Sequence, residues 1–155
     1  MRDYVQKINL DEYRGILVIS GDGLVYEVVN GLMERSDWAH AIKTPFGQIP
    51  GGSANALACS CAHLSKEAYK GLSLEQFASL TTFNMSKSVA VPVDLVVYQT
   101  AGNAKPIYSF LSFEWALIAD LDLESEKYRF MGNLRFAFGA VKRVISTIIN
   151  NIGLL

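Results

Sequence analysis

A short apolar strand pattern that ends in a glycine-rich turn and continues as a helix constrains this chain more than any other feature. Residues 15–20, Gly-Ile-Leu-Val-Ile-Ser, form a continuous apolar run typical of a buried parallel strand. Gly21-Asp22-Gly23 interrupts the run, and apolar residues then recur at helical spacing from Leu24 to Met33. The sequence therefore predicts the front half of a βαβ unit.

The same order of strand, loop and helix occurs again further along the chain. Residues 46–50 predict a second strand, residues 51–55 (Gly-Gly-Ser-Ala-Asn) a tight loop, and residues 56–63 a helix rich in small residues. The carboxyl ends of neighbouring parallel strands meet at one edge of a sheet, so we expect the two loops to lie together. Both loops open onto a helix N-terminus, where backbone amides favour an anion such as phosphate. Neither loop is a Walker A or a G-x-G-x-x-G motif.

The remainder of the chain predicts further helices and one hairpin. Apolar spacing indicates helices at residues 1–10, 36–42, 73–82 and 134–149. Residues 89–98 and 107–113 have strand character around a turn that contains glycine and proline, which predicts an antiparallel hairpin. We place a domain boundary before this hairpin, so that residues 1–88 and 89–155 form different domains.

The charges of the 155-residue chain balance overall but are unevenly placed. The chain has 14 Lys+Arg and 15 Asp+Glu, and the net charge of −1 argues against nucleic acid as a partner. Five acidic and no basic residues lie between residues 114 and 126, and five basic and no acidic residues follow from residue 127 to the end. This pattern suits a site that handles a cation on one side and an anion on the other. The alternative is two solvated faces.

The sequence shows no feature of a secreted or membrane-spanning chain. Cys59 and Cys61 are the only cysteines, and their tight spacing suits core packing in a reducing, cytoplasmic compartment better than a zinc site. The charged residues 1–13 do not resemble a signal peptide, and no stretch reaches the ~18 apolar residues of a membrane span. The chain stops inside the apolar run 144–155. We therefore expect a fragment or a shortened gene product that is poorly soluble.

Three ordered motifs resemble the diacylglycerol kinase catalytic superfamily, in the form carried by sphingosine kinases. Residues 20–32 (Ser-Gly-Asp-Gly-Leu-Val-Tyr-Glu-Val-Val-Asn-Gly-Leu) resemble the GDG signature of that superfamily. Residues 49–58 (Ile-Pro-Gly-Gly-Ser-Ala-Asn-Ala-Leu-Ala) resemble its second loop. Residues 118–129 (Ile-Ala-Asp-Leu-Asp-Leu-Glu-Ser-Glu-Lys-Tyr-Arg) are similar to a sphingosine-kinase segment that diacylglycerol kinases do not share in this form. The resemblance covers most of the chain.

The resemblance implies a role for individual residues. Asp22 corresponds to the proposed general base, which takes the proton from the primary hydroxyl of the lipid. Asp122 corresponds to the acid that holds the sphingoid head group, and the other substrate-binding positions are Ser20, Gly21, Gly23 and Ser112. The implied cofactors are ATP and Mg²⁺. The positions that correspond to nucleotide contacts are Glu27, Gly52, Ser53, Ala54, Arg129 and Arg135.

The resemblance also implies a fold and a set of partners. The fold class is α/β: a parallel-sheet nucleotide-binding part is followed by the start of a β-rich sandwich that binds lipid, and both parts are incomplete. We expect an ATP-dependent kinase that phosphorylates sphingosine or a related sphingoid base. We expect this kinase in the cytoplasm, peripherally associated with membranes, and a homo-oligomer is possible. The alternatives are a catalytically incompetent remnant that binds a lipid or a partner, and a diacylglycerol or ceramide kinase. A neutral diacylglycerol offers no ammonium for Asp122 to hold.

Three local details carry structural expectations of their own. Ala54 stands where the family usually has glycine, so its methyl group is expected to crowd the nucleotide or to bar a positive φ. Arg129 and Arg135 point in different directions on one helix and converge only if Gly132 breaks it. Likewise, Asp120 and Asp122 diverge if their segment is helical.

Overall fold

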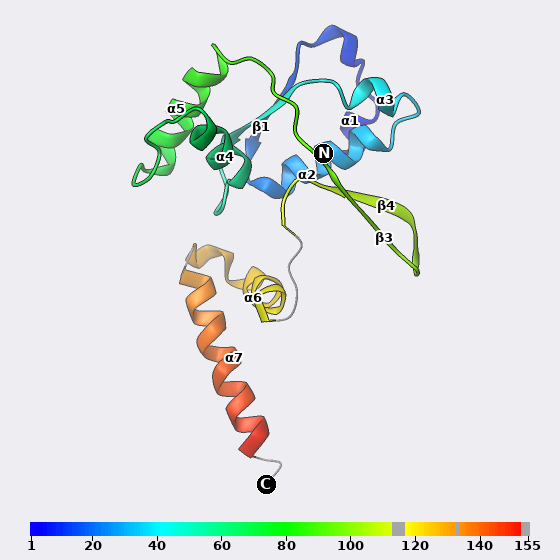
Figure 1. Cartoon of the computed structure of the whole chain (residues 1–155). Helices are drawn as coiled ribbons and strands as arrows, with labels where there is room; N and C mark the ends of the chain where they lie inside the picture. Colours follow the sequence, from blue (N-terminus) through cyan, green and yellow to red (C-terminus); the bar gives the residue numbers. More distant parts are fainter. Residues whose placement is uncertain (113–116, 133, 153–155) are drawn as a thin grey trace. The chain divides into compact units, whose positions relative to one another are not determined.

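The computed structural model describes residues 1–112, 117–132 and 134–152, which fall into two compact units, residues 1–111 and 112–155 (Figure 1). The side chains of residues 103–104, 117–118, 129–130 and 147–152 are outside this description. The elements of the first unit are α1 (Arg2–Val5), η1 (Leu10–Glu12), β1 (Ile16–Ser20), α2 (Asp22–Met33), α3 (Trp38–Ala41), β2 (Phe46–Pro50), α4 (Ala56–Leu64), α5 (Leu74–Met85), β3 (Val96–Thr100) and β4 (Asn103–Ser109). The second unit contains α6 (Leu117–Ser125), η2 (Glu126–Met131) and α7 (Leu134–Ile152).

A parallel pair of strands, β1 and β2, places the two predicted loops next to each other. The register sets Ile16 opposite Phe46 and Ser20 opposite Pro50, so both strands end at the same level. A helix follows each loop, α2 after the first and α4 after the second. The predicted repeat of strand, loop and helix and the mixed α/β class are therefore confirmed.

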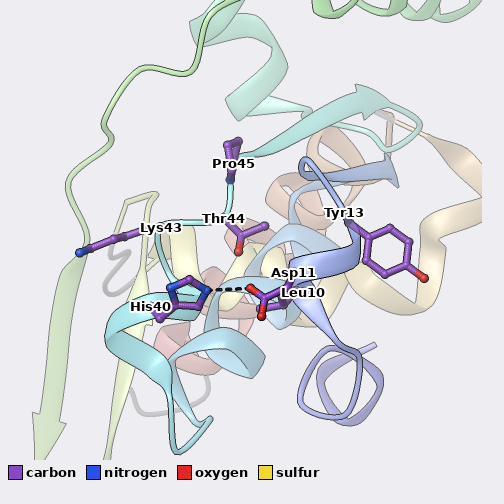
Figure 2. Close-up of a pocket in the computed structure, with 7 residues that line it drawn as sticks. All are labelled: Leu10, Asp11, Tyr13, His40, Lys43, Thr44 and Pro45. Carbon is purple, nitrogen blue, oxygen red and sulfur yellow. Dashed lines mark hydrogen bonds and ion pairs between the residues drawn. The ribbon is translucent and has the colours of Figure 1, made fainter.

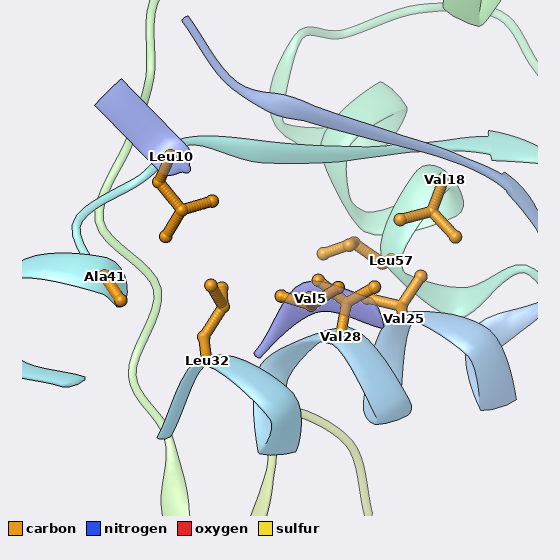
Figure 3. Close-up of a cluster of buried hydrophobic side chains, with 8 residues drawn as sticks. All are labelled: Val5, Leu10, Val18, Val25, Val28, Leu32, Ala41 and Leu57. Atoms are coloured by element: carbon orange, nitrogen blue, oxygen red, sulfur yellow. The ribbon is translucent and has the colours of Figure 1, made fainter. Parts of the chain in front are cut away.

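The core of the first unit lies between α2 and β1. Figure 3 shows Val25 and Val28 of α2 on the side of Val18 of β1, while Leu32, further along α2, lies toward Leu10 and Ala41, and all of these side chains are buried. Burial of a side chain of this size contributes about 1.5–3 kcal/mol, so this cluster holds α2 against the sheet. The start of α2, with Asp22, is thereby fixed relative to the end of β1.

The opposite face of β1 differs from the prediction of a fully buried strand. Leu17 is 61% exposed and Ile19 is 74% exposed, whereas Val18 between them is buried. On that face, α5 packs against β2 instead, with Met85 so near Gly47 that a Cβ there would lie 2.7 Å from the Met85 Cε. Among the described residues, β1 is therefore covered on one face only.

An antiparallel hairpin of β3 and β4 follows, as predicted, although the strands begin and end elsewhere. Val96 pairs with Ser109 and Thr100 with Asn103. Residues 89–95, which the alternation of valines predicts to be extended strand, form no strand. The physical reason is that β4 ends at the residue opposite Val96, so nothing remains to pair with the earlier residues.

A buried asparagine fastens this hairpin to α2. The Asn30 side chain donates from Nδ2 to the Tyr108 carbonyl oxygen (2.8 Å), and its Oδ1 accepts from the Tyr108 backbone amide (3.0 Å). By its contacts the hairpin therefore belongs with the first unit, which extends to Leu111. The boundary between residues 88 and 89 stays a prediction about domain organisation.

The described part of the second unit is helical. Gly132, at φ +57°, separates η2 from α7, so the break on which convergence of Arg129 and Arg135 depends is present. A β-rich sandwich stays a prediction, because the described residues after Ser109 form no strand. None of the helices described here combines the length and the apolar character that crossing a bilayer requires.

Candidate active site

Asp22 joins the two loops through its carboxylate. It is the first residue of α2, and its Oδ2 accepts a hydrogen bond from the Ala56 amide (2.9 Å) while its Oδ1 accepts one from the Leu57 amide (3.2 Å). These are the first two amides of α4, which cannot find a partner within their own helix. The residue before them, Asn55, makes no side-chain cap. Asp22 therefore caps α4 from the neighbouring loop.

Gly21 and Gly52 allow the backbones of the two loops to touch. A Cβ added to Gly52 would lie 2.4 Å from the Gly21 Cα, a distance that no side chain tolerates. Gly21 itself has φ −77°, and neither it nor Gly23 has a positive φ. The first loop therefore does not use the positive φ that glycine allows, and Gly21 and Gly52 are needed for the close approach of the two backbones.

Asn55 shapes the second loop. It has φ +56°, and its Oδ1 accepts hydrogen bonds from the amides of Gly51 (3.2 Å) and Gly52 (2.8 Å), while its Nδ2 donates to the Gly52 carbonyl (2.7 Å). Asparagine tolerates this left-handed conformation better than most residues. Ala54, one position earlier, does not have a positive φ. The expected conflict between the Ala54 methyl group and a positive φ is therefore absent.

The amides of the second loop divide into occupied and open groups. Asn55 binds those of Gly51 and Gly52, and no hydrogen bond within the described structure uses those of Ser53 and Ala54. Ser53 and Ala54 are also exposed. In the first loop, no side chain caps α2, and a Cβ on Gly23 would meet nothing within 4 Å. Open amides on two touching loops suit a phosphate group.

Gln48 is a member of this site that the sequence analysis missed. Its side chain, 1% exposed in the middle of β2, donates from Nε2 to the Ser20 carbonyl (3.0 Å) and accepts at Oε1 from the Ala58 amide (3.0 Å). A buried carboxamide must find such partners, because leaving it unpaired costs free energy. The available signal was a polar residue inside an otherwise apolar strand.

Glu27 and Cys59 lie near the loops on α2 and α4. The Glu27 carboxylate is 3.0 Å from the amino group of Met1, and hydrogen bonding to that group lowers the pKa of Glu27. Burial, and to a lesser degree the Asp22 charge, raises the pKa of the Cys59 thiol. Glu27 lies one helical turn beyond the glycine turn, and its nucleotide contact stays a prediction.

In the second unit, the predicted head-group acid and a predicted phosphate-binding arginine contact each other. Arg135 is 5% exposed, and it donates from Nη1 to Glu126 (2.8 Å) and from Nη2 to Asp122 (3.4 Å). Its Nε is buried without a partner. Arg129 belongs to η2, but its side chain lies outside the described residues, and Ser112 is exposed.

The acidic and basic blocks pair with each other across α6, η2 and α7. Asp120 and Glu124 both bind Arg143, while Asp122 and Glu126 both bind Arg135. Acidic residues four apart share one face of a helix, so each pair meets one arginine. Asp120 and Asp122 diverge, as predicted for a helical segment. The uneven charge distribution thus forms ion pairs within this unit. This arrangement is neither the predicted site for a cation and an anion nor the alternative of two solvated faces.

A shallow depression of about 280 Å³ lies at the other end of the strands (Figure 2). Its lining comes from the segments that precede β1 and β2, and the Nε2 of His40 lies 3.1 Å from the Asp11 carboxylate. It contains none of the predicted site residues. The lining residues are Leu10, Asp11, Tyr13, His40, Lys43, Thr44 and Pro45.

Comparison with known proteins places these loops in a family. Residues 1–98, which include both loops, match the diacylglycerol kinase catalytic domain. The chain is similar to human sphingosine kinase 1, with 41% identity over 143 residues that make up 92% of this chain and 36% of the relative. It is 38% identical over 144 residues to sphingosine kinase 2 of Arabidopsis thaliana, covering 93% of this chain and 28% of that protein.

A fungal relative extends the comparison. Sphingoid long chain base kinase 4 of Schizosaccharomyces pombe is 38% identical over 147 residues, which cover 92% of this chain and 29% of the relative. The chain thus spans about a third of the length of these curated relatives. The domain match covers more than half of the chain and contains the residues that join the two loops. The chain therefore belongs to the diacylglycerol kinase catalytic domain family.

Proposed function

We propose that the protein is an ATP-dependent lipid kinase that phosphorylates the primary hydroxyl of sphingosine or a related sphingoid base. The observation that carries this proposal is the junction of the two loops, where the Asp22 carboxylate binds the amides of Ala56 and Leu57 in the segment that directly follows the open amides of Ser53 and Ala54. A base and an anion-binding surface are thereby within one small region. These are the two groups that transfer of a phosphoryl group to an alcohol requires.

Asp22 is the proposed general base. Each of its oxygens accepts one amide, and a carboxylate oxygen can accept a second hydrogen bond, so a lipid hydroxyl can still bind. In the proposed step the hydroxyl oxygen forms a bond to the γ-phosphorus, the bond from that phosphorus to the bridging oxygen of ADP breaks, and the proton passes to Asp22. The amides hold the carboxylate in one orientation before the substrate arrives.

The nucleotide contacts in this proposal come from the first unit. The open amides of Ser53 and Ala54, together with the start of α2, suit the phosphates of ATP. Mg²⁺ neutralises phosphate charge in reactions of this kind. Among the described residues, no three or more His, Cys, Asp or Glu side chains are arranged so that they could hold a metal ion, and we propose that Mg²⁺ binds mainly through the phosphates.

The sphingoid specificity of the proposal is supported by the names of the relatives and by Asp122. The relatives with the identities given above are called sphingosine or sphingoid base kinases. Asp122 is exposed, so its carboxylate can accept a cationic head group beside Arg135. A cytoplasmic location, peripheral contact with membranes and homo-oligomer formation stay predictions, which cell fractionation and light scattering can test.

A chimera tests the proposal directly. Residues 1–155 replace the aligned segment of human sphingosine kinase 1, and transfer of radiolabelled phosphate from ATP to sphingosine, diacylglycerol and ceramide is measured beside the 155-residue chain alone. We expect the chimera to prefer sphingosine, and Asp22→Asn in the chimera to reduce kcat by roughly 10²–10⁴-fold. A folded chimera without kinase activity would favour the non-catalytic alternative, and equal use of diacylglycerol would refute the sphingoid assignment.

Asp122→Ala in the same chimera tests head-group recognition. We expect the KM for sphingosine to rise roughly tenfold, with little change in the KM for ATP, because a hydrogen-bonded charge partner of the ammonium is lost. Asp120→Ala is the matched control, since Asp120 pairs with Arg143 and points away from Asp122. Equal effects of Asp122→Ala on both substrates would place Asp122 outside the head-group site.

A further inference from the structure

Gln48 lies in β2 and connects the end of β1 to the beginning of α4, the helix that follows β2. Its Nε2 donates to the Ser20 carbonyl, the last of β1, and its Oε1 accepts from the Ala58 amide, the third of α4. Both ends of the buried carboxamide are therefore used, in two different segments. The two hydrogen bonds are each 3.0 Å long.

The Ala58 bond completes an unusual cap. The first amides of any α-helix lack partners inside the helix and are most often satisfied by the residue just before it. In α4 the first two amides bind Asp22 and the third binds Gln48, so all three depend on residues distant in the sequence. Loss of Gln48 would leave the Ala58 amide without its partner and the Ser20 carbonyl with only the Gly51 amide, at 3.3 Å.

We propose that Gln48 is a positioning residue for the candidate active site. Its carboxamide holds the Ser20 peptide, which leads directly into Gly21 and Asp22, at a fixed distance from the start of α4, whose amides orient the Asp22 carboxylate. Gln48 touches neither of the open amides and acts only through these neighbours. The importance of Gln48 for catalysis rests on the proposed function. The structural coupling of the two loops by Gln48 does not depend on that proposal.

Hydrogen exchange in the 155-residue chain tests the coupling. Gln48→Met keeps the size of the side chain but removes both hydrogen bonds, and we expect exchange to accelerate at Ala58, at Leu57 and at residues 21–23. Gln48→Glu keeps an acceptor for the Ala58 amide but lacks the N–H donor to the Ser20 carbonyl. The Ala58 amide should therefore stay protected from exchange, while the amides of residues 21–23 exchange faster than in the wild type. Gln99→Met, on the exposed face of β3, is the matched control.

A variant that is destabilised elsewhere in the first unit shows whether Gln48→Met acts on the two loops in particular or only lowers the stability of the whole unit. Leu10→Ala removes buried volume at the end of the strands opposite the loops, and it should accelerate exchange without selecting the loops. If Gln48→Met changes exchange only at Ala58, or reproduces the Leu10→Ala profile, the proposed coupling is refuted.

Binding of mant-ATP with Mg²⁺ then tests the consequence for the site. We expect Gln48→Met to raise the Kd on the order of tenfold, and Gln99→Met to leave it unchanged. An unchanged Kd in Gln48→Met, with normal binding by the wild type, refutes the positioning role. If the wild-type chain does not bind mant-ATP, the proposed function fails at its nucleotide step, and the exchange data decide the coupling independently.

Discussion

The cap that Asp22 provides for α4 leads to a prediction about stability as well as about catalysis. Asp22→Ala removes both acceptors of the Ala56 and Leu57 amides, whereas Asp22→Asn keeps one oxygen and replaces the other with an NH₂ group that faces an N–H. Both variants also remove a negative charge from the N-termini of α2 and α4. The loops should therefore loosen in both variants, and more in the alanine variant.

The size of the effect follows from the geometry. Replacement of a helix cap costs about 0.5–2 kcal/mol, and the lost interaction with a helix dipole costs about 0.3–1 kcal/mol. Asp22 is half-buried, so solvent can replace part of what is lost. We expect a loss in the free energy of unfolding of about 1–3 kcal/mol for Asp22→Ala and about 0.5–2 kcal/mol for Asp22→Asn.

Urea unfolding of the chain, followed by circular dichroism, measures this loss. With an m-value of about 1–3 kcal/mol/M, the midpoint should fall by roughly 1 M in Asp22→Ala and by less in Asp22→Asn. Asp94→Asn, an exposed carboxylate in the segment between α5 and β3, is the matched control and should leave the midpoint unchanged. Unchanged midpoints in both Asp22 variants would refute the cap, and activity losses could then be assigned to the general base alone.

Three further predictions concern the surroundings of the loops. Gly52→Ala should lower the free energy of unfolding by about 1–3 kcal/mol in a urea titration, because its Cβ would lie 2.4 Å from the Gly21 Cα and force the loops apart. Asn30→Leu should release the hairpin, seen as faster proteolysis between β3 and β4 at unchanged helix content, because both backbone groups of Tyr108 lose their partner. Alkylation of Cys59 by iodoacetamide should reach half its maximal rate at a higher pH than free cysteine, because burial raises the pKa of this thiol and less thiolate is present at any given pH.

Local patterns in the sequence were sufficient for most of the secondary structure. Helical periodicity and strand runs depend on neighbouring residues, so β1, α2, β2 and α4 were predictable in type and nearly in extent. Whether Gly132 breaks the last helical segment stayed open in the sequence, and the structure shows the break, with this glycine in a left-handed conformation. The adjacency of the two loops followed from the parallel strands alone.

The extent of β3 and the exposure of β1 were not predictable in this way. A valine alternation such as that of residues 89–95 becomes a strand only if another strand lies opposite, and β4 ends before it reaches them. Likewise, the apolar run of β1 indicates a strand but does not say what covers each face. Both properties depend on partners that the local sequence does not specify.

The sequence by itself determined which residues stand at the ends of the strands and, through its motifs, which family the chain belongs to. Only the tertiary structure decided what those residues bind. Asp22 caps a helix 34 and 35 residues away, Gln48 reaches 10 residues forward to Ala58, and Asn30 holds Tyr108 at a separation of 78 residues. Such contacts satisfy buried polar groups whose partners are brought near by packing, and packing depends on the whole chain.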